Sequence, residues 1–285
     1  MRITRLYQAV AQQSNFFVAL PAFIWQILFL WLPLLFVLYA ALYTPATGLT
    51  IQYVRLVIDA AHISVIVRSL VVAFINATVC LFLAYPVAYT IAFRAGRFKS
   101  VALFFVTLPF WINLLVQFYA WLHVLAYDGI LNSILLRLHL IATPLTIVNT
   151  TYAVLIVMAQ AYLPFMILPL YTIFEKFDHR LIEASLDLGA SRGQTFWRVT
   201  FPLTLPGARI GFFLVFVISF GEYLIPTLMA GGKQLFVGTL ISNYFVVARQ
   251  LSLGAAFTLV SSIALIVALL TCGWFFMMLQ RGTRR

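Results

Sequence analysis

The sequence predicts an all-α integral membrane protein with six transmembrane helices. Of its 285 residues 64% are hydrophobic and only 9% are charged, whereas about a quarter of the residues in a soluble domain are charged. Six apolar runs reach the roughly 20 residues that a helix needs to cross a hydrocarbon core of about 30 Å, and Glu222 is the one carboxylate inside them. Such runs must be helical, because lipid cannot satisfy the backbone polar groups of an open alternative.

The six runs occupy residues 17–43, 69–93, 101–126, 146–173, 208–229 and 254–279. The first follows a polar start, residues 1–15, and it is too long and too interrupted by proline for a cleaved signal peptide. We therefore expect it to be retained as a span, and we expect residues 1–285 to form a single transmembrane domain.

Lysine and arginine residues predict the orientation, because positive charge is retained on the cytoplasmic side. With both termini inside, 13 of the 18 basic residues are cytoplasmic: Arg2, Arg5, Arg94, Arg97, Lys99, Lys176, Arg180, Arg192, Arg198, Arg209, Arg281, Arg284 and Arg285. The remaining five, Arg55, Arg68, Arg137, Lys233 and Arg249, then lie outside. This topology places the long polar segment 178–207, between the fourth and fifth spans, in the cytoplasm.

The expected outer segments carry little further chemistry. Residues 46–68 form a long first loop with Asp59 and His62, and residues 131–140 form a short amphipathic stretch that we expect to lie along the outer surface. Cys80 and Cys272 fall inside apolar runs, which favours inert packing residues.

The remaining composition excludes several function classes. The net charge of +11 is spread over the ends of apolar runs and forms no continuous face for nucleic acid. The four histidines have no metal-ligand spacing. No Gly-Lys-Ser/Thr phosphate loop, zinc helix or nucleophile elbow is present, so we expect no catalytic residue, no metal and no cofactor in this chain.

Residues 178–207 read as two short helices joined by a bend. Asp178 is a plausible N-cap for the first helix, and Gly189 supplies its left-handed stop. The helix places one stripe of residues on a common face: Leu181, Ala184, Ser185 and Leu188.

The second helix of this segment should follow at once. Ser191 with Gln194 three residues later is a capping-box pattern. Pro202 and Pro206 are expected to end this helix before the next apolar run.

The residues Glu183-Ala184-Ser185 are followed by Gly189 after three residues, and then by Val199-x-Phe201-Pro202 after nine more. This part of the segment resembles the EAA loop of ABC-importer permeases. The family pattern is Glu-Ala-Ala, three residues, Gly, nine residues, Ile-x-Leu-Pro. The resemblance implies a coupling helix that docks into a cleft of a cytoplasmic ATPase subunit, through Glu183, Ala184, Ser185, Asp187, Gly189, Arg192 and Pro202. The alternative is an amphipathic hairpin that lies on the membrane surface.

Further stretches resemble the permeases of polyamine importers of the spermidine/putrescine type. They are Arg68-Ser-Leu, 83–89, 108–113, 129–132, 163–170, 221–226 and Gly231-Gly232. Related importers of ferric iron, opines or amino-acid-like solutes share parts of this pattern. The resemblance implies a permease of the bacterial inner membrane with several partners: two ATPase subunits that bind ATP and Mg²⁺, a second, similar permease in a heterodimer, and an extracytoplasmic substrate-binding protein.

Polyamine chemistry indicates candidates for the substrate path. A flexible polycation needs carboxylate counter-charges and aromatic faces for cation–π contact. The candidates are Glu222, Tyr223, Trp111, Tyr119, Trp121 and Asp128. Aromatic residues also belong at membrane interfaces, and Glu222 could instead be a structural partner for an arginine or a helix end.

Two other classes remain open at this point. A gradient-driven secondary transporter should show titratable residues in several spans or an inverted repeat, and the chain has only Glu222 inside a span. A membrane-embedded enzyme would need a polar catalytic cluster, which the sequence lacks.

Overall fold

The computed structural model describes residues 20–44 and 48–282. Residues 17–19 of the expected first span lie outside these ranges, as do Arg2, Arg5, Arg284 and Arg285. Six helical segments in the described residues are long and apolar enough to cross a membrane: Leu20–Leu42, Ala60–Phe93, Leu114–Arg137, Thr151–Glu175, Arg192–Phe220 and Leu251–Met278. The prediction of an all-helical protein with six spans is confirmed.

The chain divides into two compact units, of which the first contains residues up to Asp59 and Tyr244–Val260. Its elements are η1 (Ile27–Trp31), α2 (Leu32–Leu42), β1 (Tyr43–Thr44), β2 (Gly48–Leu49), α3 (Gln52–Leu56), most of η5 (Asn243–Val247) and the first turns of α14 (Leu251–Gly282). The two strands form a minimal antiparallel pair in which Tyr43 is opposite Leu49.

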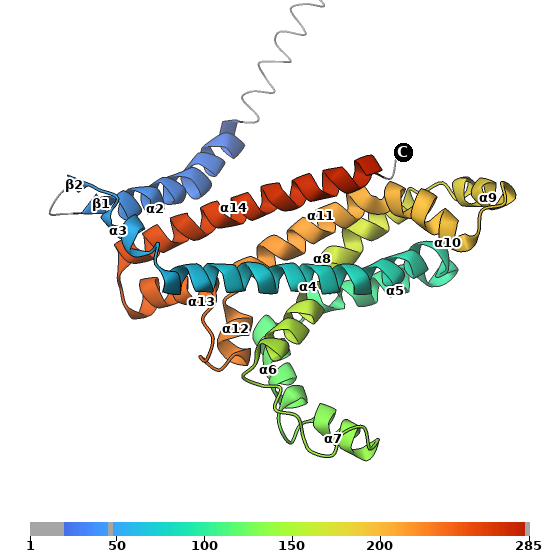
Figure 1. The fold of residues 1–285 in the computed structure, drawn as a ribbon, viewed down its shortest axis with the longest axis horizontal. Helices are drawn as coiled ribbons and strands as arrows, with labels where there is room; N and C mark the ends of the chain where they lie inside the picture. The colour runs from blue at the N-terminus through green and yellow to red at the C-terminus, as the bar shows by residue number, and fades with distance from the viewer. Residues whose placement is uncertain (1–19, 45–47, 283–285) are drawn as a thin grey trace, which may run out of the picture. The chain divides into compact units, whose positions relative to one another are not determined.

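The second unit contains Ala60–Asn243 and the chain from Ser261 onward. Its elements are α4 (Ala60–Phe93), η2 (Gly96–Phe98), α5 (Lys99–Thr107), η3 (Leu108–Trp111), α6 (Leu114–Leu125), α7 (Ile130–Arg137), α8 (Thr151–Glu175), α9 (Arg180–Asp187), α10 (Arg192–Thr195), η4 (Phe196–Thr200), α11 (Phe201–Phe220), α12 (Leu224–Met229), α13 (Val237–Ser242) and the rest of α14. The ends of α4 and α8 lie near α9 and α10 (Figure 1).

The second span differs from the expected range 69–93, because α4 already begins at Ala60. The expected loop 46–68 therefore contains β2, α3 and the first turns of α4. Arg68 limited the apolar run in the sequence, but it is exposed on α4 and does not end the helix. A long basic side chain can extend its charge away from the apolar surface while its backbone stays helical.

The third span is broken, contrary to the uninterrupted helix expected over 101–126. α5 ends at Thr107, a short 3₁₀ turn follows, and α6 starts anew at Leu114. Pro109 has no backbone N–H to continue the helix. Asn113 then caps α6, because its Oδ1 accepts hydrogen bonds from the backbone N–H of Leu115 at 2.9 Å and of Val116 at 3.4 Å.

The core of the second unit is formed by α4, α8 and α11, which have the most extensive mutual contacts. One face of α4 carries small residues that are fully buried: Ala73, Ala77, Cys80, Ala84 and Ala88. α11 contributes Gly207 and Gly211, where an added Cβ would lie 2.7 Å from Ile173 Cγ1 and 2.7 Å from Met166 Sδ. Small residues at four-residue spacing allow membrane helices to approach closely.

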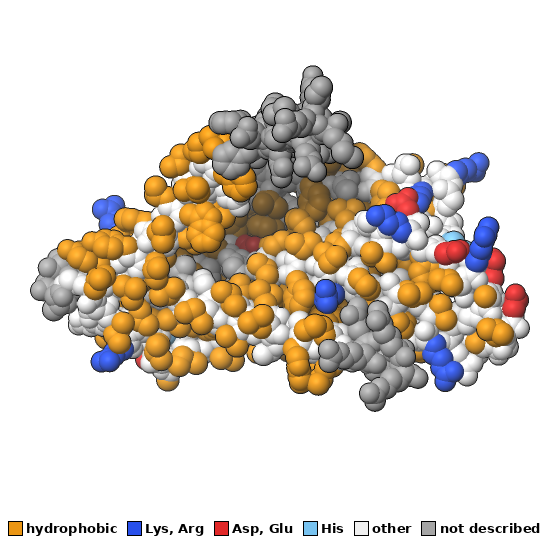
Figure 2. All heavy atoms as spheres, turned by 90° about the horizontal axis from the view of Figure 1, so that it is seen from above, with side chains coloured by type: hydrophobic (Ala, Val, Ile, Leu, Met, Phe, Trp, Pro, Cys, Tyr) orange, Lys and Arg blue, Asp and Glu red, His pale blue; other side chains and the backbone are white. Residues whose placement is uncertain are grey.

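Charged side chains are concentrated at one end of the second unit. The helix sides are mostly apolar, and basic and acidic side chains gather at the end that holds α9 and α10 (Figures 1 and 2). Lys99 at the start of α5 donates to Glu175 at the end of α8 at 2.8 Å. This distribution is typical of helices that sit in lipid with one polar end outside it.

Candidate functional site

The first arm of the polar segment 178–207 has the C-terminal stop that the sequence predicts, but its N-cap is His179 and not Asp178. The side chain of His179 forms no cap bond, and Asp178, one residue earlier, accepts a hydrogen bond through Oδ1 from the Arg180 backbone N–H at 3.0 Å. Gly189 adopts the left-handed conformation with φ +82°. The N–H of Ala190 donates to the Ser185 carbonyl and that of Gly189 to the Leu186 carbonyl, which forms a Schellman motif.

The second arm begins with the predicted capping box. Ser191 Oγ accepts from the Gln194 N–H at 3.3 Å, and Gln194 Oε1 accepts from the Ser191 N–H at 2.9 Å. The two arms are joined where Ser185 Oγ and Thr195 Oγ1 lie 3.0 Å apart. We call residues 178–195 the coupling hairpin, after the role that the sequence predicts for it.

The expected end of the second arm at Pro202 and Pro206 is wrong. The chain is helical from Arg192 to Phe220, and the two prolines lie within this long segment. A π-helical turn, η4, precedes Pro202, and the Phe201 N–H donates to the Phe196 carbonyl. Such a wider turn provides hydrogen bonds for some of the backbone groups that would otherwise lack a partner next to a proline.

The expected stripe on α9 is shifted. Ile182 and Ser185 are the half-buried positions, whereas Leu181 is 46% and Leu188 is 89% exposed. The cause is Thr195, which holds Ser185 and so turns its side of α9 toward α10. The other predicted coupling residues are exposed, except for the half-buried Pro202: Glu183, Ala184, Asp187, Gly189 and Arg192.

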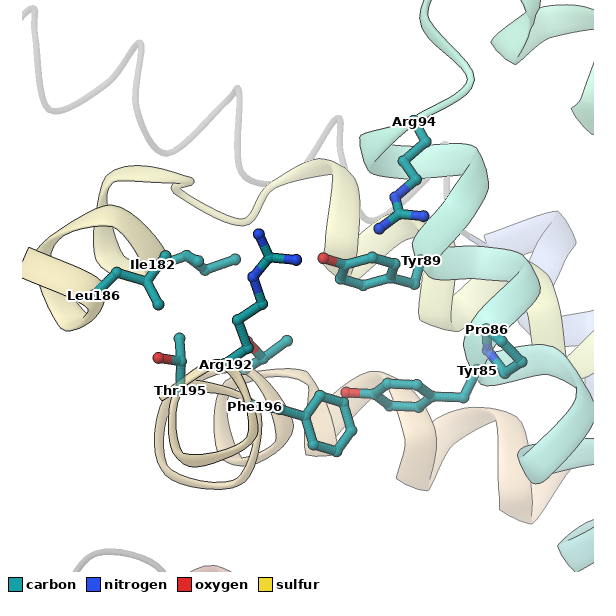
Figure 3. A pocket seen from close by; sticks show the side chains of 10 residues that line it. Tyr85, Pro86, Tyr89, Arg94, Ile182, Leu186, Arg192, Thr195 and Phe196 are labelled. Carbon is teal, nitrogen blue, oxygen red and sulfur yellow. The ribbon is translucent and has the colours of Figure 1, made fainter. Parts of the chain in front are cut away.

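A cavity of about 580 Å³ separates the hairpin from the end of α4. Figure 3 shows Arg192 of α10 and Tyr89 of α4 pointing into it from opposite sides, with Arg94 beside Tyr89. Ile182 and Leu186 of α9 form another wall. Reasoning from the sequence did not predict that α4 completes this site.

Glu222 lies where the fifth span breaks, between α11 and α12. Its Oε1 accepts hydrogen bonds from the backbone N–H groups of Tyr223 at 3.1 Å, Leu224 at 2.8 Å and Ile225 at 3.2 Å. Its Oε2 accepts from the hydroxyl of Tyr162 on α8. The carboxylate thus caps α12, which is the helix-end role that the sequence left open beside a counter-charge for substrate.

The aromatic candidates are only partly brought together. Trp121 Nε1 donates to Gln160 Oε1 at 3.1 Å, and Gln117 Nε2 donates to the same oxygen at 2.8 Å. Trp111 and Tyr119 are exposed on η3 and α6, Asp128 is exposed in the turn before α7, and Tyr223 precedes α12.

Gln117, Gln160 and Tyr162 were missed by reasoning from the sequence, which counted only charges inside the spans. The available signal was a neutral polar side chain within an apolar run, which is costly unless it has a partner. Sequence reasoning also missed the Gly207-x-x-x-Gly211 spacing, a readable signal for close helix packing. Among the described residues, no three His, Cys, Asp or Glu side chains come together to hold a metal ion.

The six spans, with a capped polar hairpin at the charged end of the core, define a multi-pass membrane protein. Residues 81–285 match the family described as the binding-protein-dependent transport system inner membrane component. The chain belongs to this family. It is therefore an inner membrane permease component.

Curated relatives and a solved structure agree with this assignment. The chain is 37% identical to the spermidine/putrescine transport system permease protein PotB of Haemophilus influenzae, over 82% of this chain and 84% of that protein. It is 36% identical to PotB of Escherichia coli K12, over 86% and 92% respectively. A chain in the crystal structure of a bacterial alginate ABC transporter, in complex with an alginate pentasaccharide-bound periplasmic protein, shares the fold with a TM-score of 0.69 and 16% identity, over 94% of this chain and 95% of that chain.

Proposed function

We propose that this chain is the permease subunit of an ATP-driven importer for polyamines such as spermidine and putrescine. The observation that carries this proposal is identity of 36–37% over more than four-fifths of the chain to permeases named for that transport. The resemblance of the short stretches such as 83–89 and 221–226 supports the same substrate class.

The partners follow from the family and from the exposed face of the coupling hairpin. A second, homologous permease completes the path, two ATPase subunits bind ATP and Mg²⁺ on the cytoplasmic side, and a binding protein delivers substrate from outside. Both termini lie in the cytoplasm in this arrangement. Leu181 and Leu188 expose apolar surface beside Glu183 and Asp187, a combination that suits a docking surface.

In the proposed mechanism, closure of the ATPase dimer moves the hairpin, and the core helices turn as rigid bodies to expose the path outward. Such alternating access around a fixed route is general for transporters built from helix bundles. The path runs near Trp121, Tyr119, Trp111, Tyr223 and Asp128, and Glu222 holds α12 beside it.

Purification with the proposed partners and uptake into proteoliposomes test this function. A copurifying ATPase subunit and sister permease, with ATP-dependent uptake of labelled spermidine that unlabelled putrescine suppresses, would support it. Competition by ferric iron or an opine instead would reassign the substrate. Uptake driven by an ion gradient without any ATPase would refute the coupling role of the hairpin.

A further inference from the structure

The cavity beside the coupling hairpin lies at the boundary between a membrane span and the polar end. Tyr85, Pro86 and Tyr89 belong to the last turns of α4, whereas Arg94 comes directly after that helix ends at Phe93. Phe196 closes the cavity from η4 (Figure 3). An apolar floor and a cationic rim therefore meet in one space of about 580 Å³.

The rim carries positive charge that this chain does not neutralise. Arg94 and Arg192 are exposed, and neither forms an ion pair within the described residues. Lys99, by contrast, is paired with Glu175. The described lining residues include no carboxylate. Glu183 and Asp187 project from α9 outside the lining.

The hydroxyl groups that line the cavity differ in whether they are already hydrogen-bonded within the chain. Tyr85 Oη lies 2.8 Å from Thr204 Oγ1, and Thr195 Oγ1 lies 3.0 Å from Ser185 Oγ, so both are engaged within the chain. The ring of Tyr89 packs against Phe93 and Phe174, which fixes the direction of its hydroxyl toward the cavity. Two guanidinium groups and one phenol thus surround the same space.

We propose that this cavity binds an anionic phospholipid, with the phosphate between Arg94 and Arg192 and the start of an acyl chain against Pro86 and Phe196. Basic pockets between membrane helices on the cytoplasmic side suit anionic headgroups, and guanidinium groups bind phosphate through paired hydrogen bonds. A small soluble anion would use the rim but would leave the apolar floor without a partner.

A lipid in this place would connect the end of α4 to the coupling hairpin. The proposal rests on the proposed function in one respect, namely that this end of the molecule faces the cytoplasm. Its central claim concerns binding and can be measured without transport, so the two can fail separately.

Native mass spectrometry of the delipidated full-length chain tests the proposal, with phosphatidylglycerol and phosphatidylcholine as probes. The wild type should prefer phosphatidylglycerol. In the double variant Arg94→Gln, Arg192→Gln this preference should fall about 30-fold, since each arginine near a lipid phosphate is worth about 1 kcal/mol and about 1.4 kcal/mol is a factor of ten. Arg94→Lys with Arg192→Lys should retain most of it, because charge is kept, and this variant controls for folding.

The matched control is Arg97→Gln, because Arg97 is also exposed but stacks over Phe98 at 4.9 Å and does not line the cavity. Equal loss in this control would overturn the proposal in favour of unspecific surface charge. Full competition by soluble glycerol phosphate would overturn the lipid in favour of a free anion. Unchanged lipid binding in the double variant, with lost ATPase copurification, would assign the two arginines to the ATPase interface instead.

Discussion

Glu222 offers the sharpest test of how the path is built, because its carboxylate has two competing roles. Its substitution by glutamine removes the charge but keeps an oxygen that can accept from the N–H groups of Leu224 and its neighbours, and the new amide can donate to Tyr162. Substitution by alanine removes every one of these contacts. The two variants therefore separate the loss of charge from the loss of the cap.

The structure allows a rough magnitude for each change. Loss of the cap in Glu222→Ala should cost about 1 kcal/mol, and leaving the hydroxyl of Tyr162, which is 8% exposed, without an acceptor should cost a further 1–3 kcal/mol or so. Glu222→Gln loses only the charge at the N-terminus of α12, worth about 0.5 kcal/mol. We expect alanine to destabilise the protein clearly and glutamine to leave it close to the wild type.

The assay combines thermal melting of the purified complex with spermidine uptake into proteoliposomes, normalised to assembled complex. Uptake in Glu222→Gln should remain within a factor of about three, as expected for a change of about 0.5 kcal/mol. Tyr162→Phe, which removes one hydrogen bond and no charge, is the matched control. A glutamine variant that melts and assembles like the wild type but loses uptake at least tenfold would refute the cap as the main role and show that substrate uses the charge.

Three further predictions concern the polar end. Gly189→Val should lower uptake and substrate-stimulated ATP hydrolysis together, because a side chain at φ +82° costs about 1–2 kcal/mol, even though an added Cβ meets no atom within 4 Å. Gly189→Asn should be better tolerated. Normal transport in the valine variant would count against a coupling role for the hairpin. Glu183→Lys should weaken retention of the ATPase during purification without affecting membrane insertion; unchanged retention would remove Glu183 from the interface. The hydrogen bond to Glu175 raises the pKa of Lys99 above its usual 10.5, so that the contribution of this pair is present below that pH and is lost as the pH rises through the raised pKa. The difference in melting between wild type and Lys99→Gln should be constant from about pH 6 to 9 and vanish in stronger alkali, and a difference that vanishes near neutrality would contradict this origin.

The six spans, the C-terminal stop of α9 and the capping box of α10 could be predicted because each depends on local sequence. An apolar run that crosses a lipid bilayer can fold only as a helix or as part of a closed barrel. The capping box at Ser191 and the left-handed conformation of Gly189 depend only on neighbouring residues. The orientation of the spans and the coupling role of the hairpin stay predictions that the experiments above address.

The sequence alone could not show which prolines interrupt a helix and which lie within one. Pro109 lies at a break, whereas Pro86, Pro164 and Pro206 lie inside continuous helices. Neighbouring helices hold the latter three in place, since α4, α8 and α11 pack on one another, and a local rule contains no such information. The shifted stripe on α9 has the same origin, because Thr195 on another element selects the inward face.

One consequence of the continuous segment from Arg192 to Phe220 is mechanical. It begins at the capping box inside the hairpin, fits against α8 at Gly207 and Gly211, and ends at Phe220, two residues before Glu222, whose carboxylate caps α12. Since close-packed helices move as rigid bodies and do not deform continuously, a displacement of the hairpin is carried to α12 unless it is absorbed at the π-helical turn Phe196–Thr200 or at the break between α11 and α12. That turn lies next to the cavity of Arg94 and Arg192. An occupant of the cavity would therefore act beside a point at which this segment can yield, and we expect its binding to affect coupling more than assembly.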